Sequence, residues 1–579
     1  MASIFLIDPD QTASPTVSII IQPYEQDNSI KLTPSNFPGL EVDVQKVLGQ
    51  PSTAFIVLPP NSPDPNNIIG LNAAPSNVGT NSNNLLGNLQ DLTSLITPMS
   101  TVTIQMTRGS YTYIVFFGVV ISTKETESRQ NERVLRLMEI SCIDMQYYLT
   151  NFAYFTLSWM GAEFNILKNI GNYAGAKMLA SGGVSNTSPQ VLASNFMNLV
   201  ANAFLANMQL PVNDGRYNYP QLVESRFGPF NSGSIAISFP FISSFYNAEG
   251  TWWNKFTTFF PTPYYEMFFQ TFDETVDDTI PNETSTGIPL LLPPTIPANT
   301  FTLDGRPFKN MFIARQMPFP RISSDTGNPP FILDLSSWNA LGEYQFANSN
   351  TPFIQSSMEF SQEDARSFYI VDPSLINQLY GGSTGGGVPA YVLYNFAAAV
   401  DPLNLTKFGY RPEISQIQWF FSPVPNSTTS LVSFGASLLL TLSSYFEPLP
   451  LCAKGTITLP LSPTILQGNK ITLQPFKNGA EWTFYIDSVT HHYEFGEASV
   501  TTLQLSRGLP QEIYFNKDNL LTSMLQGLVE RTNYQYSLIA NPAVLGITGL
   551  TLIASANGNA VMNKLLPAWG VPQAQATSN

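Results

Sequence analysis

Apolar and polar residues alternate along several segments of this chain, and the first such run predicts three β-strands in a row. The strands are expected at about 101–107, 113–121 and 134–140, with a tight turn at Arg108-Gly109 and a polar loop at 124–133. Alternation with a period of two turns one face of a strand inward and the other toward water. The segment therefore predicts an antiparallel meander.

A second run near the C-terminus repeats this order. Strands are expected at about 471–473, 482–489 and 500–505, with a turn at Asn478-Gly479 and a polar loop at 491–497. Asn-Gly supplies the positive φ angles that a two-residue hairpin turn needs. The chain is therefore predicted to carry one small β unit twice, although any two hairpins of an all-β protein share such alternation.

The alternation also predicts which side chains face inward in the two copies. In the first copy they are Val102, Ile104, Val115 and Phe117, and in the second Ile471, Leu473, Phe484, Ile486, Leu503 and Leu505.

Between the two copies the period changes to that of helices, which divides the chain of 579 residues into regions. Before the first meander, strands are expected at 17–22, 29–32, 40–48 and 54–58, followed by a long loop at 59–87. Amphipathic helices are expected at 163–178, 191–208 and 520–531, the last after a possible N-cap at Asp518. The predicted regions are a first β domain at 1–150, an inserted α+β region at 151–390, a second β domain at 391–512, and a helical C-terminal segment and tail at 513–579.

Two segments of the inserted region are unusual in composition. The stretch 217–272 is rich in aromatic residues, including Trp252-Trp253 and Phe268-Phe269, which predicts a hydrophobic core more than a stacked ligand. Asp273, Glu274, Asp277 and Asp278 follow it and predict a solvated acidic loop, because the spacing of an EF-hand calcium loop is absent.

Composition narrows the class of protein. Charged residues make up 12% of the chain, about half of the roughly 25% that is typical, which suits a protein buried in a large assembly. The net charge of -15 argues against general nucleic-acid binding, because affinity for phosphates needs clustered Lys and Arg.

Cys142 and Cys452 are the two cysteines, and both are expected to be buried apolar residues, with a long-range bridge left open. No apolar run reaches the roughly 18 residues of a membrane span, so no stable membrane insertion is expected. The first residues lack a basic leader, so we expect the chain to be made and retained in a cytoplasm.

The sequence offers little for catalysis. Its only histidines, His491 and His492, are neighbours on a predicted strand, so one should be packed and the other solvated. No arrangement of carboxylates singles out an acid and a nucleophile, and no cofactor or metal pattern is present. A structural role is therefore favoured over an enzyme.

The second meander resembles the closing hairpin of phage tail baseplate hub proteins. The resemblance lies in 482–496, which contains Val489-Thr-His491, and in 499–508, which reads SVTTLQLSRG. The lead-in at 455–473 fits as well. In the first copy, Phe116-Phe117-Gly118-Val119-Val120 with 140–144 looks like the first hub barrel, and Phe408-Gly-Tyr-Arg411-Pro412 is a weaker match.

This resemblance implies a mainly β fold with an α+β insertion and two tail-tube-like antiparallel β-barrels per chain, the inward residues above belonging to the barrel and assembly strands. It also implies a homotrimer in the virion tail baseplate that joins a six-fold tail tube protein to a three-fold central spike protein. Other baseplate proteins are further expected partners, and DNA would only pass through the channel. Val115→Asp is expected to prevent assembly by placing a charge on a buried barrel face.

Two other classes fit the same sequence less well. A capsid or other virion structural β protein would have a similar composition, but it would lack the paired units. A tail-tip enzyme that binds or cleaves glycans would use the aromatic block 252–269 together with carboxylates such as Glu266 or Asp273.

Overall fold

A computed structural model of the chain places a discontinuous set of residues, and the description below is confined to them. They are 4–7, 13–25, 29–58, 95–109, 111–130, 133–151, 153–154, 193–194, 197–198, 200, 205–212, 215–228, 237–238, 250–273, 297–303, 305–323, 332–347, 354–373, 397–400, 402–417, 420–421, 438, 441–474, 476 and 480–510.

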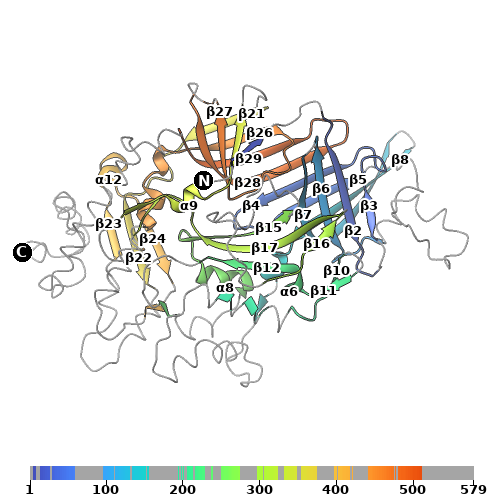
Figure 1. Cartoon of the computed structure of the whole chain (residues 1–579), viewed down its shortest axis with the longest axis horizontal. Coiled ribbons are helices and arrows are strands. Elements are labelled where there is room, and N and C mark those ends of the chain that lie inside the picture. Colours follow the sequence, from blue (N-terminus) through green and yellow to red (C-terminus); the bar gives the residue numbers. More distant parts are fainter. Residues whose placement is uncertain are drawn as a thin grey trace, which may run out of the picture.

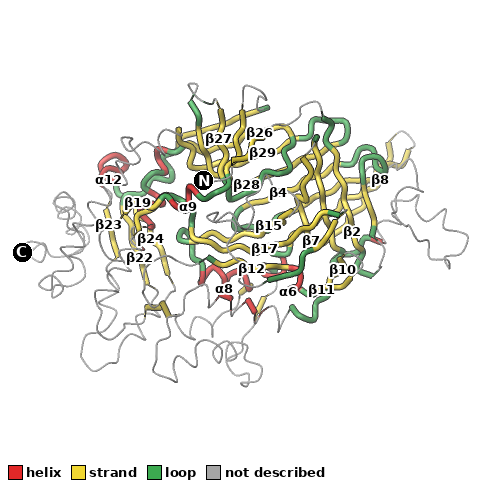
Figure 2. Tube along the Cα trace, viewed as in Figure 1, coloured by secondary structure: helices red, strands yellow, loops and turns green. Residues whose placement is uncertain are grey.

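Within these residues fourteen strands join one large sheet, which has two recognisable units (Figures 1 and 2). Strands of the first unit lie side by side in the order β4-β5-β8-β7-β6-β2-β3. Their bounds are β2 Thr16–Gln22, β3 Ile30–Leu32, β4 Glu41–Val47, β5 Thr53–Leu58, β6 Thr101–Arg108, β7 Tyr111–Gln130 and β8 Arg133–Asp144.

The first unit closes over one hydrophobic core. All seven strands contribute alternate side chains to it, including those of both end strands, such as Ile30 and Leu32 of β3 and Val42 and Val44 of β4. A sheet whose first and last strands share one core must roll around it. This is the arrangement expected of a barrel-like unit.

The second unit has the strand order β21-β26-β29-β28-β27-β20-β1. Its strands are β1 Ile4–Ile7, β20 Glu343–Ala347, β21 Gln355–Phe360, β26 Ala453–Pro460, β27 Lys470–Gln474, β28 Trp482–Glu494 and β29 Val500–Pro510. Its core contains side chains from β20, β26, β27, β28 and β29, with Met358 of β21 packed against it.

Five consecutive strands of the two units correspond in order and direction. The antiparallel series β4-β5-β8-β7-β6 matches β21-β26-β29-β28-β27. The correspondence ends at the sixth strand, because β2 runs antiparallel to β6 whereas β20 runs parallel to β27. The predicted repetition of one β unit is therefore present in the topology.

A smaller sheet from the middle of the chain lies against both units (Figure 1). It has the order β12-β17-β15, with β16 also paired to β17, and the helices α6 and α8 lie on its other side (Figure 2). The bounds are α6 Tyr219–Leu222, β12 Val223–Phe227, α8 Trp252–Phe259, β15 Tyr265–Asp273, β16 Phe301–Leu303 and β17 Arg306–Gln316.

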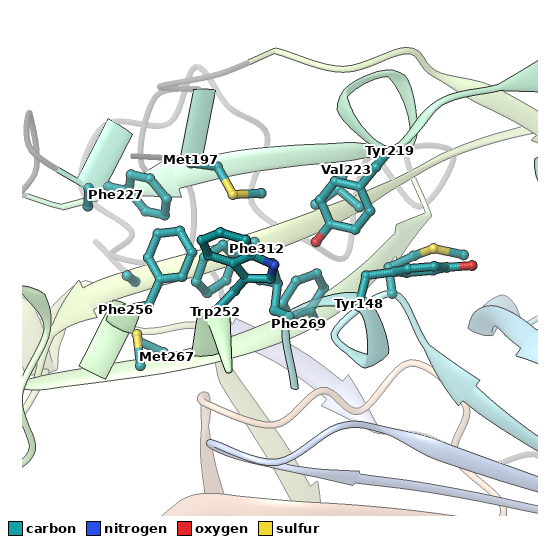
Figure 3. Close-up of a cluster of buried hydrophobic side chains, with 14 of the residues drawn as sticks. Tyr148, Met197, Tyr219, Val223, Phe227, Trp252, Phe256, Met267, Phe269 and Phe312 are labelled. Carbon is teal, nitrogen blue, oxygen red and sulfur yellow. The ribbon is translucent and has the colours of Figure 1, made fainter. Parts of the chain in front are cut away.

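The aromatic stretch forms the core between this sheet and its helices, as predicted. Phe269 of β15 stacks on Phe312 of β17 with ring centroids 4.9 Å apart, and Phe256 of α8 meets Phe312 edge to face. Figure 3 shows these rings together with Trp252 and Phe227. The rings are buried among apolar neighbours, so they serve packing.

Shorter elements complete the described chain. They are α2 Tyr147–Thr150, β9 Ala153–Tyr154, β10 Leu210–Val212, β11 Gly215–Tyr217, β13 Ile237–Ser238, β14 Gly250–Thr251, β18 Arg321–Ser323, β19 Ile332–Asp334, α9 Ser336–Asn339, β22 Phe368–Pro373, β23 Ala397–Val400, α12 Pro402–Phe408, β24 Pro412–Ile417, β25 Phe420–Phe421 and η3 Leu449–Leu451.

The fold class is as predicted, mainly β with large antiparallel sheets, and the strands expected at 17–22 and 29–32 are present as the antiparallel pair β2 and β3. Two predicted polar loops are wrong. Residues 124–130 continue β7 and 491–494 continue β28, because a paired strand needs backbone partners and not apolar side chains.

Several predictions fall outside the described residues. They are the loop at 59–87, the helices at 163–178 and 520–531, and the Asn478-Gly479 turn. The helix at 191–208 is described only in part. Within the range 151–390 assigned to the insertion, β20 and β21 belong to the sheet of the second unit.

Candidate assembly surface at the joint between the two units

One pair of strands, β4 and β28, joins the two units into a continuous sheet. Seven residue pairs connect them in antiparallel register, from Ser488 opposite Val47 to Glu494 opposite Glu41. Leu48 extends the ladder, because its N–H donates to the carbonyl of Asp487 over 3.1 Å. The edge of the first unit is thereby covered by the second unit of the same chain.

The inner side of the joint is buried. Val42 and Val44 of β4 are fully buried, and Tyr493 of β28 packs in the core of the first unit although the earlier part of β28 packs in the second. One strand therefore serves two cores. This ties the units together by burial as well as by backbone hydrogen bonds.

Both units contain the same tight turn close to the joint. In the first unit Met99, with a φ of 73°, comes two residues before β6. In the second unit Gly468, with a φ of 76°, comes two residues before β27, the counterpart of β6. The N–H of Met99 donates to the carbonyl of Val120 over 2.8 Å, and that of Gly468 to the carbonyl of Ile486 over 2.9 Å.

A β-bulge follows at the next residue in each unit. Ile121 is the extra residue of β7 opposite β8, and Asp487 is the extra residue of β28 opposite β29. A shared turn and a shared bulge at matched positions go beyond the general likeness of hairpins. They define a residue-by-residue equivalence in which Val120 corresponds to Ile486 and Ser122 to Ser488.

A polar cluster lies on the outer face of the joint. His492 Nδ1 is 2.7 Å from Oδ1 of Asp43, and its Nε2 is 3.6 Å from Oε2 of Glu494. Burial opposes the charged imidazolium, but the hydrogen bond to Asp43 and the surrounding carboxylates outweigh it and raise the pKa of His492. Burial and the nearby Asp43 and Glu494 also raise the pKa of Glu41.

Among the described residues, Glu41, Asp43 and His492 are the group whose ligand atoms lie close enough to hold a metal ion, all within 4.8 Å of one another. All three side chains are partly exposed, and His492 and Asp43 already bond to each other. Nothing else among the described residues points to a cation bound there.

The neighbouring histidine behaves differently, as predicted for adjacent strand residues. His491 is fully buried, its Nδ1 lies 3.0 Å from Oγ1 of Thr501, and burial lowers its pKa to about 3. His491 is therefore a packed neutral side chain, while His492 is half-exposed.

A buried lysine on the joint strand was not singled out from the sequence. Lys46 follows Val42 and Val44 on the inward face of β4, its Nζ has no hydrogen-bond partner, and burial lowers its pKa to about 7. It lines a small, partly open cavity, together with Asp144, Val115 and Gln270, that has room for about one water molecule. Burial likewise raises the pKa of Asp144 to about 7, although its carboxylate accepts from the N–H groups of Ser52 and Gln146.

A second buried polar group ties the middle sheet to the second unit. Arg315 of β17 pairs through Nε with Glu266 of β15 and donates through Nη2 to the carbonyl of Gly468 over 2.6 Å. The hydroxyl of Tyr485 donates to the other oxygen of Glu266 over 2.6 Å. Burial lowers the pKa of Arg315, but Glu266 overcomes this and holds it above its usual value.

Gly468 is required where it stands. A Cβ there would lie 2.9 Å from Nη2 of Arg315, and the residue also has a positive φ. The turn of the second unit is thereby fitted to the guanidinium that anchors the middle sheet.

The two carboxylates considered for a glycan enzyme are both engaged in structure. Glu266 belongs to the cluster around Arg315, and Asp273 is buried, 3.1 Å from Nε of Arg306, and accepts from the N–H of Ile114. The prediction that Asp273 belongs to a solvated loop is therefore wrong, because the residue ends strand β15 and faces the first unit. Glu274, Asp277 and Asp278 lie outside the described residues.

The side chains predicted to face inward are all buried. Val102, Ile104 and Val115 lie in the core of the first unit. Ile471, Leu473, Phe484, Ile486, Leu503 and Leu505 lie in the core of the second.

Phe117 instead packs with the middle sheet, 5.5 Å from the ring of Phe308, because a bulge between the pairings of Ile104 and Gln105 shifts the alternation along β7. Bulges are not visible in apolar alternation, so the change of face could not be predicted.

Cys142 and Cys452 are both buried, as predicted, and the bridge left open by the sequence is not formed between them. Helices capable of crossing a bilayer are not found in the part of the chain that the structure describes.

Comparisons with known proteins give structural neighbours only. No protein-family model matches the chain, and no curated protein matches it by sequence. A tail protein from Neisseria meningitidis shares 10% identity, with a TM-score of 0.37 over 85% of this chain and 96% of its own. The 43 kDa tail protein of prophage MuSo2 from Shewanella oneidensis also shares 10% identity, with a TM-score of 0.36 over 85% and 98%.

A third solved structure is a component of the type VI secretion system of E. coli. It shares 8% identity, with a TM-score of 0.31 over 82% of this chain and 73% of its own, and it is described as similar to phage tail proteins. The solved structures to which the chain is similar are thus two tail proteins and one secretion-system component.

Proposed function

We propose that this chain is the structural hub of a phage tail baseplate and that three copies form a ring around a central channel. In this ring each chain supplies two sheet units, so that three chains present six units to a six-fold tail tube protein. The opposite end of the ring would hold a three-fold central spike protein.

The observation that carries the proposal is the duplication within one chain. Five strands, a turn and a bulge recur in the same order, and the two units are already joined edge to edge through β4 and β28. Units that are equivalent and adjacent within a chain allow a three-fold assembly to imitate a six-fold ring. A protein with a single such unit could reach six only as a hexamer.

The charge of the chain is compatible with a channel through which DNA passes. A net charge of -15 repels phosphates, so the walls would not retain the polymer during passage. DNA is accordingly a passing contact and not a bound partner.

The side chains favour a structural role over a catalytic one. The carboxylates Glu266 and Asp273 are buried in ion pairs with arginines, and His491 is a neutral packed residue. A glycosidase needs two carboxyl groups that reach the substrate, one of them protonated. Neither Glu266 nor Asp273 meets that requirement.

The mass of the purified assembly tests the proposal. Three chains of 63.8 kDa should give a particle of about 191 kDa in light scattering or native mass spectrometry. Negative-stain images of the same sample should show a ring with a central opening. A single chain at working concentration, or a closed shell of many copies as in a capsid, would rule out the hub.

A further inference from the structure

Two strand edges of this chain occupy equivalent positions and differ in what covers them. The outer edge of β4 is covered by β28, as described above, whereas β21, its counterpart in the second unit, pairs only with β26 among the described strands. Ile354 and Phe360 beside this edge are more than half exposed. An uncovered edge strand with apolar residues is a site for pairing with another chain.

The strand that could cover it also has a counterpart. β4 pairs with the part of β28 beyond the end of β27, and the equivalent part of β7 lies beyond the end of β6. That part extends from Ser122 to Gln130 and pairs with β8 alone among the described strands. One chain therefore carries both halves of a second joint of the β4–β28 type, but on separate edges.

The strand registers extend this equivalence from the bulges across the sheet. The matched bulges make Cys142 of β8 equivalent to Leu505 of β29. The next strand pairing in each unit makes Ala54 of β5 equivalent to Gly455 of β26. The pairing after that makes Val44 of β4 equivalent to Met358 of β21. The existing joint places Val44 opposite His491, and the equivalent of His491 in β7 is Glu125. Met358 of one chain is thereby placed opposite Glu125 of another.

We infer that β21 pairs antiparallel with the distal part of β7 of a second copy of this chain, in the register that sets Met358 opposite Glu125. The same register sets Glu359 opposite Lys124 and Ser357 opposite Thr126. This joint repeats the β4–β28 pairing between chains.

The charges along the two edges fit this register. Lys124 and Glu359 carry opposite charges, and their side chains are 67% and 69% exposed. Each also lies near a partner in its own chain, Lys124 3.0 Å from Glu139 and Glu359 3.8 Å from Lys454, so the joint would extend two existing pairs into a four-residue network. A cross-strand pair of opposite charge favours one register over its neighbours.

This inference rests on the proposed trimer and specifies its contact. Each chain offers one β21 edge and one β7 edge, so the contact is head-to-tail and closes into a ring only if the rotation between chains is right. The alternation of joints within and between chains would then give six units around the ring.

Cysteine pairs in the full-length chain test the register. Thr126→Cys and Ser357→Cys are placed in separate copies of the chain, which are co-expressed and oxidised, so that a disulfide between these two introduced thiols must join two chains. Both positions are exposed, and the native cysteines are buried. We expect cross-linked dimers on a non-reducing gel, and cross-linked trimers when one chain carries both substitutions.

The matched control replaces Ser357→Cys by Ser356→Cys, which moves the thiol to the other face of the same strand. Cross-linking should fall at least tenfold. As a second measurement, Lys124→Glu and Glu359→Lys should each weaken trimer formation about twofold to fivefold, and the double reversal should restore it.

The outcomes separate the joint from the trimer. A particle of three chains whose 126–357 pair cross-links no better than the 126–356 control overturns this joint and leaves the hub intact. A particle that never contains three chains overturns both proposals.

Discussion

Replacing Lys46 by methionine should stabilise the protein at neutral pH, because this lysine is buried in a joint that gives it no hydrogen-bond partner. Its pKa falls from the usual 10.5 to about 7, with burial as the main cause and a weaker opposing effect of Asp144. At about 1.36 kcal/mol for each pH unit between the two values, the buried amine costs about 4 to 5 kcal/mol at pH 7. Methionine has a similar length and no charge to bury.

The sign of the pH dependence follows from proton binding. Between pH 7 and 10.5 the unfolded chain holds the Lys46 proton and the folded chain does not, so stability rises with pH in this window. Asp144, whose folded pKa is about 7, is ionised in both states above that value and adds no slope there. The advantage of Lys46→Met should therefore shrink by about 1.4 kcal/mol for each pH unit from 7 toward 10.

The test is to measure the melting temperatures of the wild type and Lys46→Met in parallel from pH 7 to 10 and to compare them at each pH. Tyrosine and cysteine titrations affect both proteins alike, so the difference between the two melting temperatures isolates the lysine. Lys46→Gln, which keeps a polar group but no charge, serves as the control and should fall between them. Equal melting temperatures at every pH, or a less stable methionine variant at pH 7, would refute the burial argument.

Four further changes test other parts of the structure. Arg315→Met leaves the buried Glu266 carboxylate without its cationic partner and should lower the free energy of unfolding by about 3 to 5 kcal/mol. Adding Glu266→Met should recover part of that loss. Val115→Asp places a charge in the first core and should abolish trimers, so a normal particle mass would contradict its inward role. Phe312→Ala removes the ring on which the middle core stacks and should cost about 3 to 5 kcal/mol, and an unchanged melting temperature would contradict the packing shown for it. The pKa of His492 is raised in the folded chain, so its contribution to stability is full below about pH 6.5 and is lost as pH rises through the folded pKa. His492→Gln should remove this fall from a plot of melting temperature against pH.

Local pattern was enough to predict the strands of both units. Segment 101–107 alternates strictly, and Leu503 and Leu505 keep the same period near the C-terminal end of the second unit; both segments lie in strands, and these apolar residues are buried. The opposite environments of His491 and His492 followed from the same alternation. These features depend on the two-residue period of a strand, which the sequence contains in full.

The β-bulges that interrupt this period cannot be predicted from the sequence. The bulges at Val115 and Ile121 change which face a side chain takes, and an extra residue in one strand is defined only by its partner strand. The polar segment at 124–130 lacks apolar alternation and therefore predicts a loop, although it pairs with β8 through its backbone.

The joint between the units was decided by tertiary structure alone. Residues 41–47 and 488–494 lie more than 400 positions apart, and neither segment records that the other is its neighbour. The same holds for Glu266, Arg315 and Tyr485, which lie far apart in the sequence, on β15, β17 and β28, and form one buried cluster. Sequence determined the two sheets through local periodicity, whereas pairing across the chain fixed their edges, because hydrogen bonds between strands depend on position in space and not on order along the chain.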